Sequence, residues 1–261
     1  MDYLIAALLG VIEGITEFLP ISSTGHLLIA ENWLGHQSDL FNIVIQAGAI
    51  VAVTMIYRQR VWTLLTGLGD PETRRYALKL ALAFAITAVL GLVVTKLGFK
   101  LPETVTPVAW ALVLGGLWMI VAERLAERRP ASTQITWTVA ILVGLAQVVA
   151  AIFPGTSRSS ATIFIALLAG TGDRKAATEF AFLVGIPTMF AASGYQLLKH
   201  LGEPAQENWG ALGVAFVVST ITAFVAVKWL LGYIQSHRFT AFAVYRIVLG
   251  VALLLWLPVG G

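Results

Sequence analysis

Long apolar stretches separated by short polar connections dominate the hydrophobic pattern of the chain. A helix needs roughly 17–25 predominantly apolar residues to cross a bilayer. Six stretches reach that length, and we predict a full transmembrane helix in each: residues 40–57, 76–98, 107–123, 178–198, 209–233 and 241–258. No soluble segment separates them, so residues 1–261 are predicted to form a single membrane domain with an all-α, polytopic fold.

Two further apolar regions, 4–34 and 135–170, are interrupted in the middle. An unbroken helix over 4–34 would be roughly 46 Å long, well beyond a hydrocarbon core of about 30 Å. Pro20 and a Ser-Ser-Thr-Gly run interrupt the first region, and Pro154-Gly155 interrupts the second. Each half is short for a crossing, so we predict two re-entrant broken-helix hairpins. For 135–170, two short full spans are the alternative.

The composition supports a membrane protein, because 58% of the residues are hydrophobic and only 12% are charged. A soluble domain would carry about a quarter charged residues. The net charge of +3 does not indicate nucleic-acid binding, since basic residues collect in the cytoplasmic loops of membrane proteins. The absence of cysteine excludes disulfides and Cys-ligated metals. No basic region precedes the first apolar stretch, so a cleaved signal peptide is not expected.

The distribution of lysine and arginine predicts the orientation. If the loop 58–75 is cytoplasmic, twelve basic residues lie inside: Arg58, Arg60, Arg74, Arg75, Lys79, Arg124, Arg128, Arg129, Arg174, Lys175, Lys228 and Arg238. Only three lie outside: Lys96, Lys100 and Lys199. This excess predicts that both termini lie outside. The first hairpin then enters from outside, and the second enters from the cytoplasm.

The two hairpins are related to each other in sequence. A shift of 134 residues pairs Gly10 with Gly144, Glu13 with Gln147, Pro20 with Pro154, Ser22 with Thr156 and Ser23 with Ser157. Three full spans follow each hairpin, and an odd number of crossings inverts the second copy. We therefore predict an inverted-topology repeat, with repeat one at 1–125 and repeat two at 133–261.

Acidic and hydroxyl groups gather in the first hairpin. Glu13 and Glu17 are four residues apart and share one helical face, and Ser22, Ser23 and His26 follow within two turns. A charge at membrane depth costs at least about 2.5–3.5 kcal/mol. We therefore favour a functional interpretation of both glutamates over simple solvation at the outer interface.

Each break also predicts an anion site. A Ser or Thr can cap a half-helix, whose free N–H groups and positive dipole end favour negative charge. Arg158 adds a forked cation suited to phosphate and lies too far from the loops to snorkel easily. Arg246, in the last apolar stretch, is expected to pair or to snorkel near the cytoplasmic end. The predicted phosphate-binding residues are Ser22, Thr24, Gly25, Gly155, Thr156, Ser157, Ser159 and Thr162.

These groups predict nucleophilic chemistry on a phosphate. Ser23 is the predicted nucleophile, with Glu17 or His26 as the base that takes its proton. Ser22 is a weaker candidate for the nucleophile, and His26 is another alternative. Glu13 and Glu17 are also candidate oxygen ligands for a divalent cation, which is compatible with phosphate chemistry if the metal neutralises charge. A site deep in an apolar protein suits a substrate that lives in lipid.

At these residues the chain resembles the undecaprenyl-diphosphate phosphatase family, also called bacitracin-resistance proteins. The matching segments are Glu13-Gly14-Ile15-Thr16-Glu17-Phe18-Leu19-Pro20-Ile21-Ser22-Ser23-Thr24-Gly25-His26 and Pro154-Gly155-Thr156-Ser157-Arg158-Ser159-Ser160-Ala161-Thr162. The resemblance extends over essentially the full length, including Tyr245-Arg246-Ile247. Both loops keep the family pattern at every motif position.

The resemblance implies hydrolysis of the C55 polyprenyl diphosphate to the monophosphate that carries cell-wall precursors. It implies a site open to the outer face of the bacterial plasma membrane and dependence on a divalent cation, Mg or Ca, without an organic cofactor. It also implies Ser23 as nucleophile, Glu17 and His26 as acid/base or orienting partners, and Arg158 on the phosphate. A homodimer is the candidate assembly.

Two other classes of protein are the alternatives. Inverted repeats with broken helices are also typical of transporters, so a transporter or flippase for a phospholipid or other anion is the main rival. We favour a hydrolase because a carrier needs anion contacts but neither nucleophile nor base. The other membrane phosphatase class needs a His and an Asp soon after its Ser-Arg pair. After Arg158 the next acid is Asp173 and the next histidine is His200, so this class fits poorly.

Overall fold

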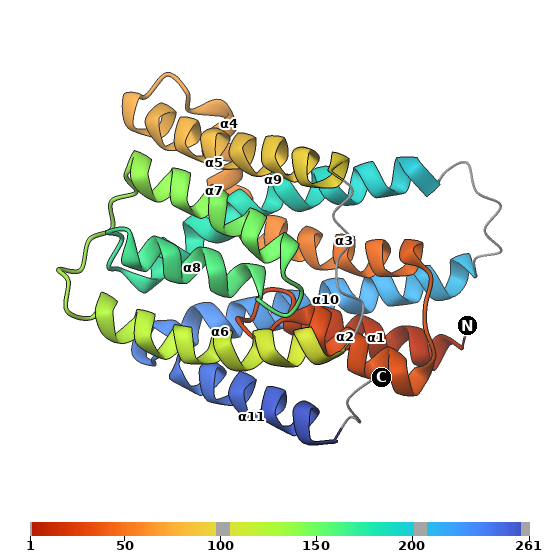
Figure 1. Cartoon of the computed structure of the whole chain (residues 1–261). Coiled ribbons are helices and arrows are strands. Elements are labelled where there is room, and N and C mark those ends of the chain that lie inside the picture. Colours follow the sequence, from red (N-terminus) through yellow and green to blue (C-terminus); the bar gives the residue numbers. More distant parts are fainter. Residues whose placement is uncertain (1, 98–104, 201–207, 257–261) are drawn as a thin grey trace.

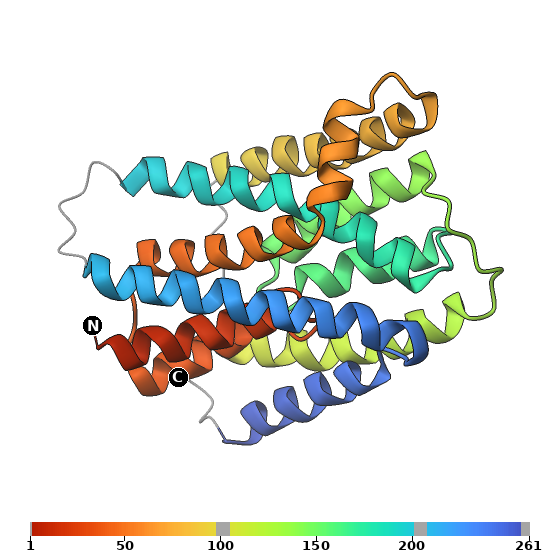
Figure 2. The ribbon, with the colours of Figure 1, turned by 180° about the vertical axis from the view of Figure 1, so that it is seen from behind.

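The computed structural model describes residues 2–97, 105–200 and 208–256, and every regular element within these ranges is a helix. Figures 1 and 2 show the bundle that they form. The described helices are α1 (Tyr3–Thr16), α2 (Ser23–Leu34), α3 (Asp39–Ile56), α4 (Arg58–Thr66), α5 (Pro71–Lys96), α6 (Val105–Ala126), α7 (Trp137–Ile152), α8 (Arg158–Leu168), α9 (Arg174–His200), α10 (Trp209–Ser236) and α11 (Thr240–Trp256).

The chain is a polytopic all-α membrane protein, as predicted. Within the described ranges, α3, α5, α6, α9 and α10 are long and apolar enough to cross a bilayer, and they cover the first five predicted spans. The sixth, 241–258, corresponds to α11, whose 17 residues stand at the lower limit for a crossing. Residue 98, residues 257–258 and Lys100, which also entered the predictions, lie outside the described residues.

The two interrupted regions form hairpins of short helices. α1 and α2 have 14 and 12 residues, and α7 and α8 have 16 and 11, so each helix is only about 16–24 Å long. In both ribbon views, α1–α2 enters from the end of the bundle where α1 begins and returns to it (Figures 1 and 2). The α7–α8 hairpin enters from the opposite end, and both turns lie in the middle of the bundle. This is the hairpin arrangement predicted for both regions, and for 135–170 it favours a re-entrant hairpin over two full spans.

The same backbone conformation begins the second helix of each hairpin. Ser22 and Ser157 have positive φ angles of 74° and 67°, a conformation that costs a non-glycine residue about 1–3 kcal/mol. Each serine offsets this cost by capping its helix. The Ser22 Oγ accepts a bond from the Gly25 N–H at 3.4 Å, and the Ser157 Oγ accepts one from the Ser160 N–H at 3.3 Å. The N-terminal ends of α2 and α8 are thereby fixed in the middle of the bundle.

Small residues let α1 pack closely against α10. A Cβ atom added at Gly10 would lie 2.6 Å from the Ala215 carbonyl oxygen, and one at Gly14 would lie 2.6 Å from that of Ser219. The Ser219 hydroxyl also donates to the Ile45 carbonyl of α3 at 2.6 Å. Close backbone approach through small residues is typical of membrane helices. This close packing against α10 fixes the position of α1, which ends beside the turn of the α1–α2 hairpin.

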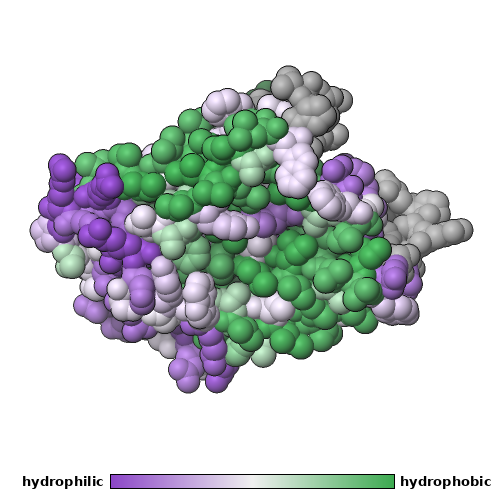
Figure 3. Space-filling model, turned by 90° about the horizontal axis from the view of Figure 1, so that it is seen from below, coloured by the Kyte–Doolittle hydropathy of each residue, from purple (hydrophilic) through white to green (hydrophobic). Residues whose placement is uncertain are grey.

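Apolar side chains cover the middle of the molecule. Figure 3 shows them as a broad green surface, while hydrophilic side chains gather at one end. That end carries the connections α6–α7, α8–α9 and α10–α11 (Figure 1). On α5, which lies on the face opposite the one in Figure 3, only 11% of the apolar window is buried, and its exposed side chains include Val89, Leu92 and Val93. These exposed apolar side chains are the ones that face lipid.

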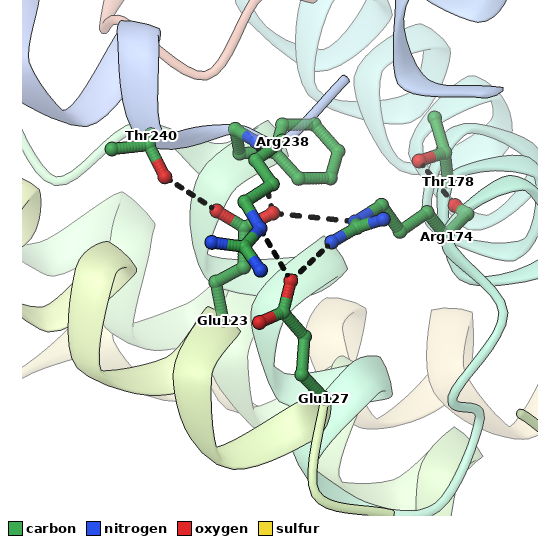
Figure 4. A network of polar contacts seen from close by, with 7 residues as sticks. Glu123, Glu127, Arg174, Thr178, Arg238 and Thr240 are labelled. Carbon is green, nitrogen blue, oxygen red and sulfur yellow. Dashed lines mark hydrogen bonds and ion pairs between the residues drawn. The ribbon is translucent and has the colours of Figure 1, made fainter. Parts of the chain in front are cut away.

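A network of charges joins three connections at the hydrophilic end (Figure 4). The buried Glu123 carboxylate accepts bonds from Arg174 Nε at 3.2 Å and from the Phe239 backbone N–H at 2.9 Å. Glu127 pairs with Arg174 Nη2 at 2.9 Å and with Arg238 Nε at 2.7 Å. The network ties the end of α6 to the start of α9 and to the α10–α11 connection.

We expect Glu123→Ala to destabilise the protein, because it leaves the buried Phe239 N–H without an acceptor and removes one partner of Arg174. An unsatisfied buried donor costs about 1–3 kcal/mol. The measurement is thermal unfolding in detergent. The matched control is Glu127→Ala, whose side chain is 32% exposed and whose pairs contribute less than about 1 kcal/mol. Equal shifts of the two midpoints would contradict this assignment.

Candidate active site

The two turns are in direct contact with each other. The Ser159 hydroxyl, in the first turn of α8, donates to the Leu19 carbonyl at 3.0 Å. The Arg158 guanidinium, one residue earlier, donates through Nη2 to Glu17 Oε1. These contacts span 140 and 141 positions of sequence and bring together one hairpin from each end of the bundle.

Glu17 joins the predicted nucleophile to the predicted phosphate-binding arginine. Its Oε2 accepts a hydrogen bond from the Ser23 hydroxyl, while its Oε1 accepts the bond from Arg158. The Glu17 side chain is only 4% exposed and that of Arg158 is 27% exposed. A carboxylate that already receives the serine O–H is placed to take its proton. The arrangement therefore favours Glu17 over His26 as the base for Ser23.

The His26 ring is held by other partners. Its Nδ1 lies 2.7 Å from the Ser22 carbonyl oxygen, and its Nε2 lies 2.7 Å from the Tyr245 hydroxyl of α11. A carbonyl only accepts, so in the neutral ring Nδ1 carries the hydrogen and Nε2 accepts from Tyr245. The ring nitrogens are thus engaged with Ser22 and Tyr245, so His26 connects the turn of the α1–α2 hairpin to α11.

Glu13 lies one helical turn before Glu17 on α1. It is 1% exposed, and its Oε2 has no hydrogen-bond partner among the described residues. Buried carboxylate oxygens are normally paired or bound to a metal. Glu13 therefore places a second buried carboxyl group next to the Ser23–Glu17–Arg158 contacts.

Most of the predicted phosphate-binding side chains have structural contacts of their own. Ser22 and Ser157 cap helices, and Ser159 donates to the Leu19 carbonyl. Thr162 donates to the Arg158 carbonyl at 2.8 Å, and the backbone carbonyls of Gly155 and Thr156 accept from Arg246. Of the two remaining residues, Gly25 is buried and Thr24 is exposed. The groups that remain suited to an anion are the N-terminal ends of α2 and α8 and the Arg158 guanidinium.

The prediction for Arg246 is wrong. This residue does not snorkel, and it pairs with no acid in the described part of the chain; it is 0% exposed and donates to backbone carbonyls of both hairpin turns. Its Nη1 lies 3.5 Å from the Pro20 oxygen and 3.0 Å from that of Thr156, and its Nη2 lies 2.9 Å from the Gly155 oxygen. A fourth contact reaches the Ala111 carbonyl on α6 at 3.1 Å. Arg246 thus connects the turn of the α1–α2 hairpin, the turn of the α7–α8 hairpin and α6.

The fold is that of a polytopic membrane protein, in which a serine, a carboxylate and an arginine come together where two broken helices meet. The chain belongs to the bacitracin resistance protein BacA family, whose model matches residues 6–252. The resemblance seen in the two loop motifs is thereby confirmed.

Curated relatives agree with this membership over nearly the whole chain. An undecaprenyl-diphosphatase of Rhizobium etli is 72% identical over 256 residues, covering 97% of each chain. One of Rhizobium leguminosarum bv. trifolii is 72% identical over 257 residues, again covering 97% of each. One of Xanthomonas oryzae pv. oryzae is 64% identical over 259 residues, covering 98% of each.

We expect Arg246→Met to lower the thermal midpoint in detergent strongly, because it removes the donors to three carbonyls at the two turns. Each buried group left unsatisfied costs about 1–3 kcal/mol. The matched control is Lys228→Met, which exchanges an exposed cation on α10 for the same side chain and should shift the midpoint little. A midpoint for Arg246→Met equal to that of the control would show that these bonds do not hold the turns.

Proposed function

We propose that the protein hydrolyses undecaprenyl diphosphate to undecaprenyl phosphate and inorganic phosphate, and so recycles the lipid carrier of cell-wall synthesis. The observation that carries the proposal is the chain of contacts from Ser23 through Glu17 to Arg158 at the junction of the two hairpins. Relatives that share 64–72% of their residues with this chain bear the name undecaprenyl-diphosphatase. A lipid-facing bundle suits a substrate with a polyprenyl tail.

The first step of the proposed reaction is attack by Ser23. Glu17 takes the hydroxyl proton, and Ser23 Oγ forms a bond to the terminal phosphorus of the diphosphate. The bond from that phosphorus to the bridging oxygen breaks, and undecaprenyl phosphate leaves with the proton. Arg158 has five N–H donors, so it can hold Glu17 and a phosphate oxygen together. The positive ends of α2 and α8 stabilise the charge that develops.

His26 acts as an orienting residue in this scheme. Its bonds to the Ser22 carbonyl and the Tyr245 hydroxyl hold the first turn of α2, which carries Ser23. Fixing a nucleophile in a reactive geometry contributes to rate because the cost of ordering it is met before substrate binds.

The acidic residues fit a divalent cation, Mg or Ca. Glu13 has a buried oxygen without a partner among the described residues, and each Glu17 oxygen keeps a lone pair beyond its hydrogen bond. One or two carboxylates plus substrate phosphates are the usual set for Mg. When bound, the cation neutralises charge on the diphosphate. Glu13 and Glu17 would hold it from the protein side.

We infer that the site and both termini face the outside of the bacterial plasma membrane. The support is that most lysine and arginine residues lie in or beside the connections at the end of the bundle opposite the start of α1, which is the hydrophilic end in Figure 3, because basic residues mark the cytoplasmic side. A homodimer stays a prediction, since either lipid or a second copy can cover the exposed apolar side chains of α5.

A transporter or flippase for an anionic lipid is the second candidate. The observation in its favour is that the hairpins enter from opposite ends and meet in the middle, which is the arrangement of many secondary transporters. A carrier would exchange lipid across vesicles while wild type released no phosphate from the diphosphate.

We expect Ser23→Ala to lose about 10³-fold or more of phosphate release from undecaprenyl diphosphate in detergent. Glu17→Gln should lose about 10²- to 10⁴-fold, because the amide cannot take the serine proton. The matched control is Ser236→Ala at the exposed end of α10, which should keep wild-type activity. Full activity in Ser23→Ala would exclude the serine nucleophile and favour His26 or a water.

We expect removal of divalent cations with EDTA to abolish activity, and added Mg or Ca to restore it. Glu13→Gln should raise the cation concentration needed for half-maximal activity by about tenfold or more, because it removes a charged oxygen ligand. The control Glu72→Gln changes an exposed acid at the start of α5 and should leave the cation titration unchanged. An identical titration for Glu13→Gln and wild type would remove Glu13 from the metal site.

A further inference from the structure

A small pocket lies beside Glu17, on the side of α7, α8 and α9. Its polar lining consists of Glu17, Gln147, Arg158, Ser159 and Thr162, and apolar residues of α9 form much of the remaining wall. The pocket has room for roughly one water molecule. It is therefore too small for a diphosphate but shares Glu17 with the predicted nucleophile.

Gln147 contributes an oriented amide to this pocket. The side chain is 1% exposed, and its Nε2 lies 3.2 Å from the Thr87 hydroxyl oxygen on α5. The single hydrogen of that hydroxyl is directed to the Ala83 and Gly144 carbonyls at 2.9 and 3.1 Å. Thr87 can therefore only accept from Gln147. This fixes Nε2 on the Thr87 side of the amide and places Oε1 on the other side.

The Gln147 Oε1 is a buried acceptor without a partner among the described residues. Leaving such a group unsatisfied costs about 1–3 kcal/mol. The Thr162 hydroxyl cannot supply the missing donor, because it donates to the Arg158 and Ser159 carbonyls. Gln147, with its unpartnered acceptor, and Glu17 thus line the same small space. A water molecule has two O–H groups, one for each of these two side chains.

We propose that Gln147 and Glu17 hold the water that completes the hydrolysis, an inference that rests on the proposed function. After the first step, Ser23 carries the phosphoryl group. The water oxygen forms a bond to the phosphorus, and the bond between phosphorus and Ser23 Oγ breaks. Glu17 takes one proton from the water and returns it to Ser23 Oγ, so inorganic phosphate leaves and the serine is regenerated. Gln147 is a positioning residue, because it acts through the water.

The residue type fits this role. Gln147 occupies the position of Glu13 when the sequence is shifted by 134 residues. An amide provides the same kind of acceptor as a carboxylate but adds no negative charge beside Glu17. The water is therefore bound without further repulsion of the incoming phosphate.

The test separates the two steps by rapid quench in detergent with undecaprenyl diphosphate. In Gln147→Leu we expect one equivalent of undecaprenyl phosphate per enzyme to be released in a burst, followed by inorganic phosphate at a rate about tenfold or more below wild type. Mass spectrometry should find phosphate on the peptide that carries Ser23. The matched control is Gln235→Leu at the exposed end of α10, which should show neither change.

Thr87→Val provides a second variant, which keeps the volume of the side chain but removes the acceptor that orients the amide. We expect the same delayed release of phosphate to a smaller extent. An equal slowing of both products without phosphate on Ser23, in either variant, would mean that Gln147 is only structural and would overturn the proposal. Wild-type release of phosphate by Gln147→Leu would also overturn it. Failure of the proposed function would look different, because wild type itself would then release neither product.

Discussion

The buried carboxylate of Glu17 is the constraint on which the rest of the site depends. A negative charge in the middle of a membrane protein is tolerated only with partners, and Glu17 finds them on both sides of the bundle, in Ser23 from its own hairpin and Arg158 from the other. Neither hairpin contains both Ser23 and Arg158. The Ser23–Glu17–Arg158 contacts therefore form only where two broken hairpins that enter from opposite ends meet in the middle of the bundle.

The surrounding structure holds that meeting point in place. Arg246 donates to carbonyls of both turns, and the glycines of α1 allow close packing against α10. The serine caps then fix where α2 and α8 begin. Each of these contacts places a backbone segment rather than a reacting atom. These backbone contacts fix the positions of Glu17, Ser23 and Arg158. An enzyme needs such fixed positions if its charged groups are to be oriented before substrate binds.

Local sequence predicts the hairpins and the groups that carry charge. Pro20, Pro154 and the hydroxyl runs after them mark the breaks, and Glu17 and Arg158 are charges in apolar surroundings that need a reason to be there. The role of Arg246 was not predictable in the same way, because its partners are carbonyls 90 to 226 positions away and carbonyls have no sequence signature. The orientation of Gln147 likewise depends on Thr87, 60 positions earlier on another helix. The contact of His26 with Tyr245, 219 positions later in the chain, also comes only from the fold, and it favours Glu17 as the base.

The central claim is that Glu17 works by activating Ser23, and a double-variant cycle tests it most directly. Phosphate release from undecaprenyl diphosphate is measured for wild type, Ser23→Ala, Glu17→Gln and the combined variant. If the two residues act as one unit, the combined variant is as slow as Ser23→Ala alone, within about threefold. If the two losses multiply instead, Glu17 contributes independently of Ser23, and the proposed transfer of the serine proton to Glu17 is contradicted.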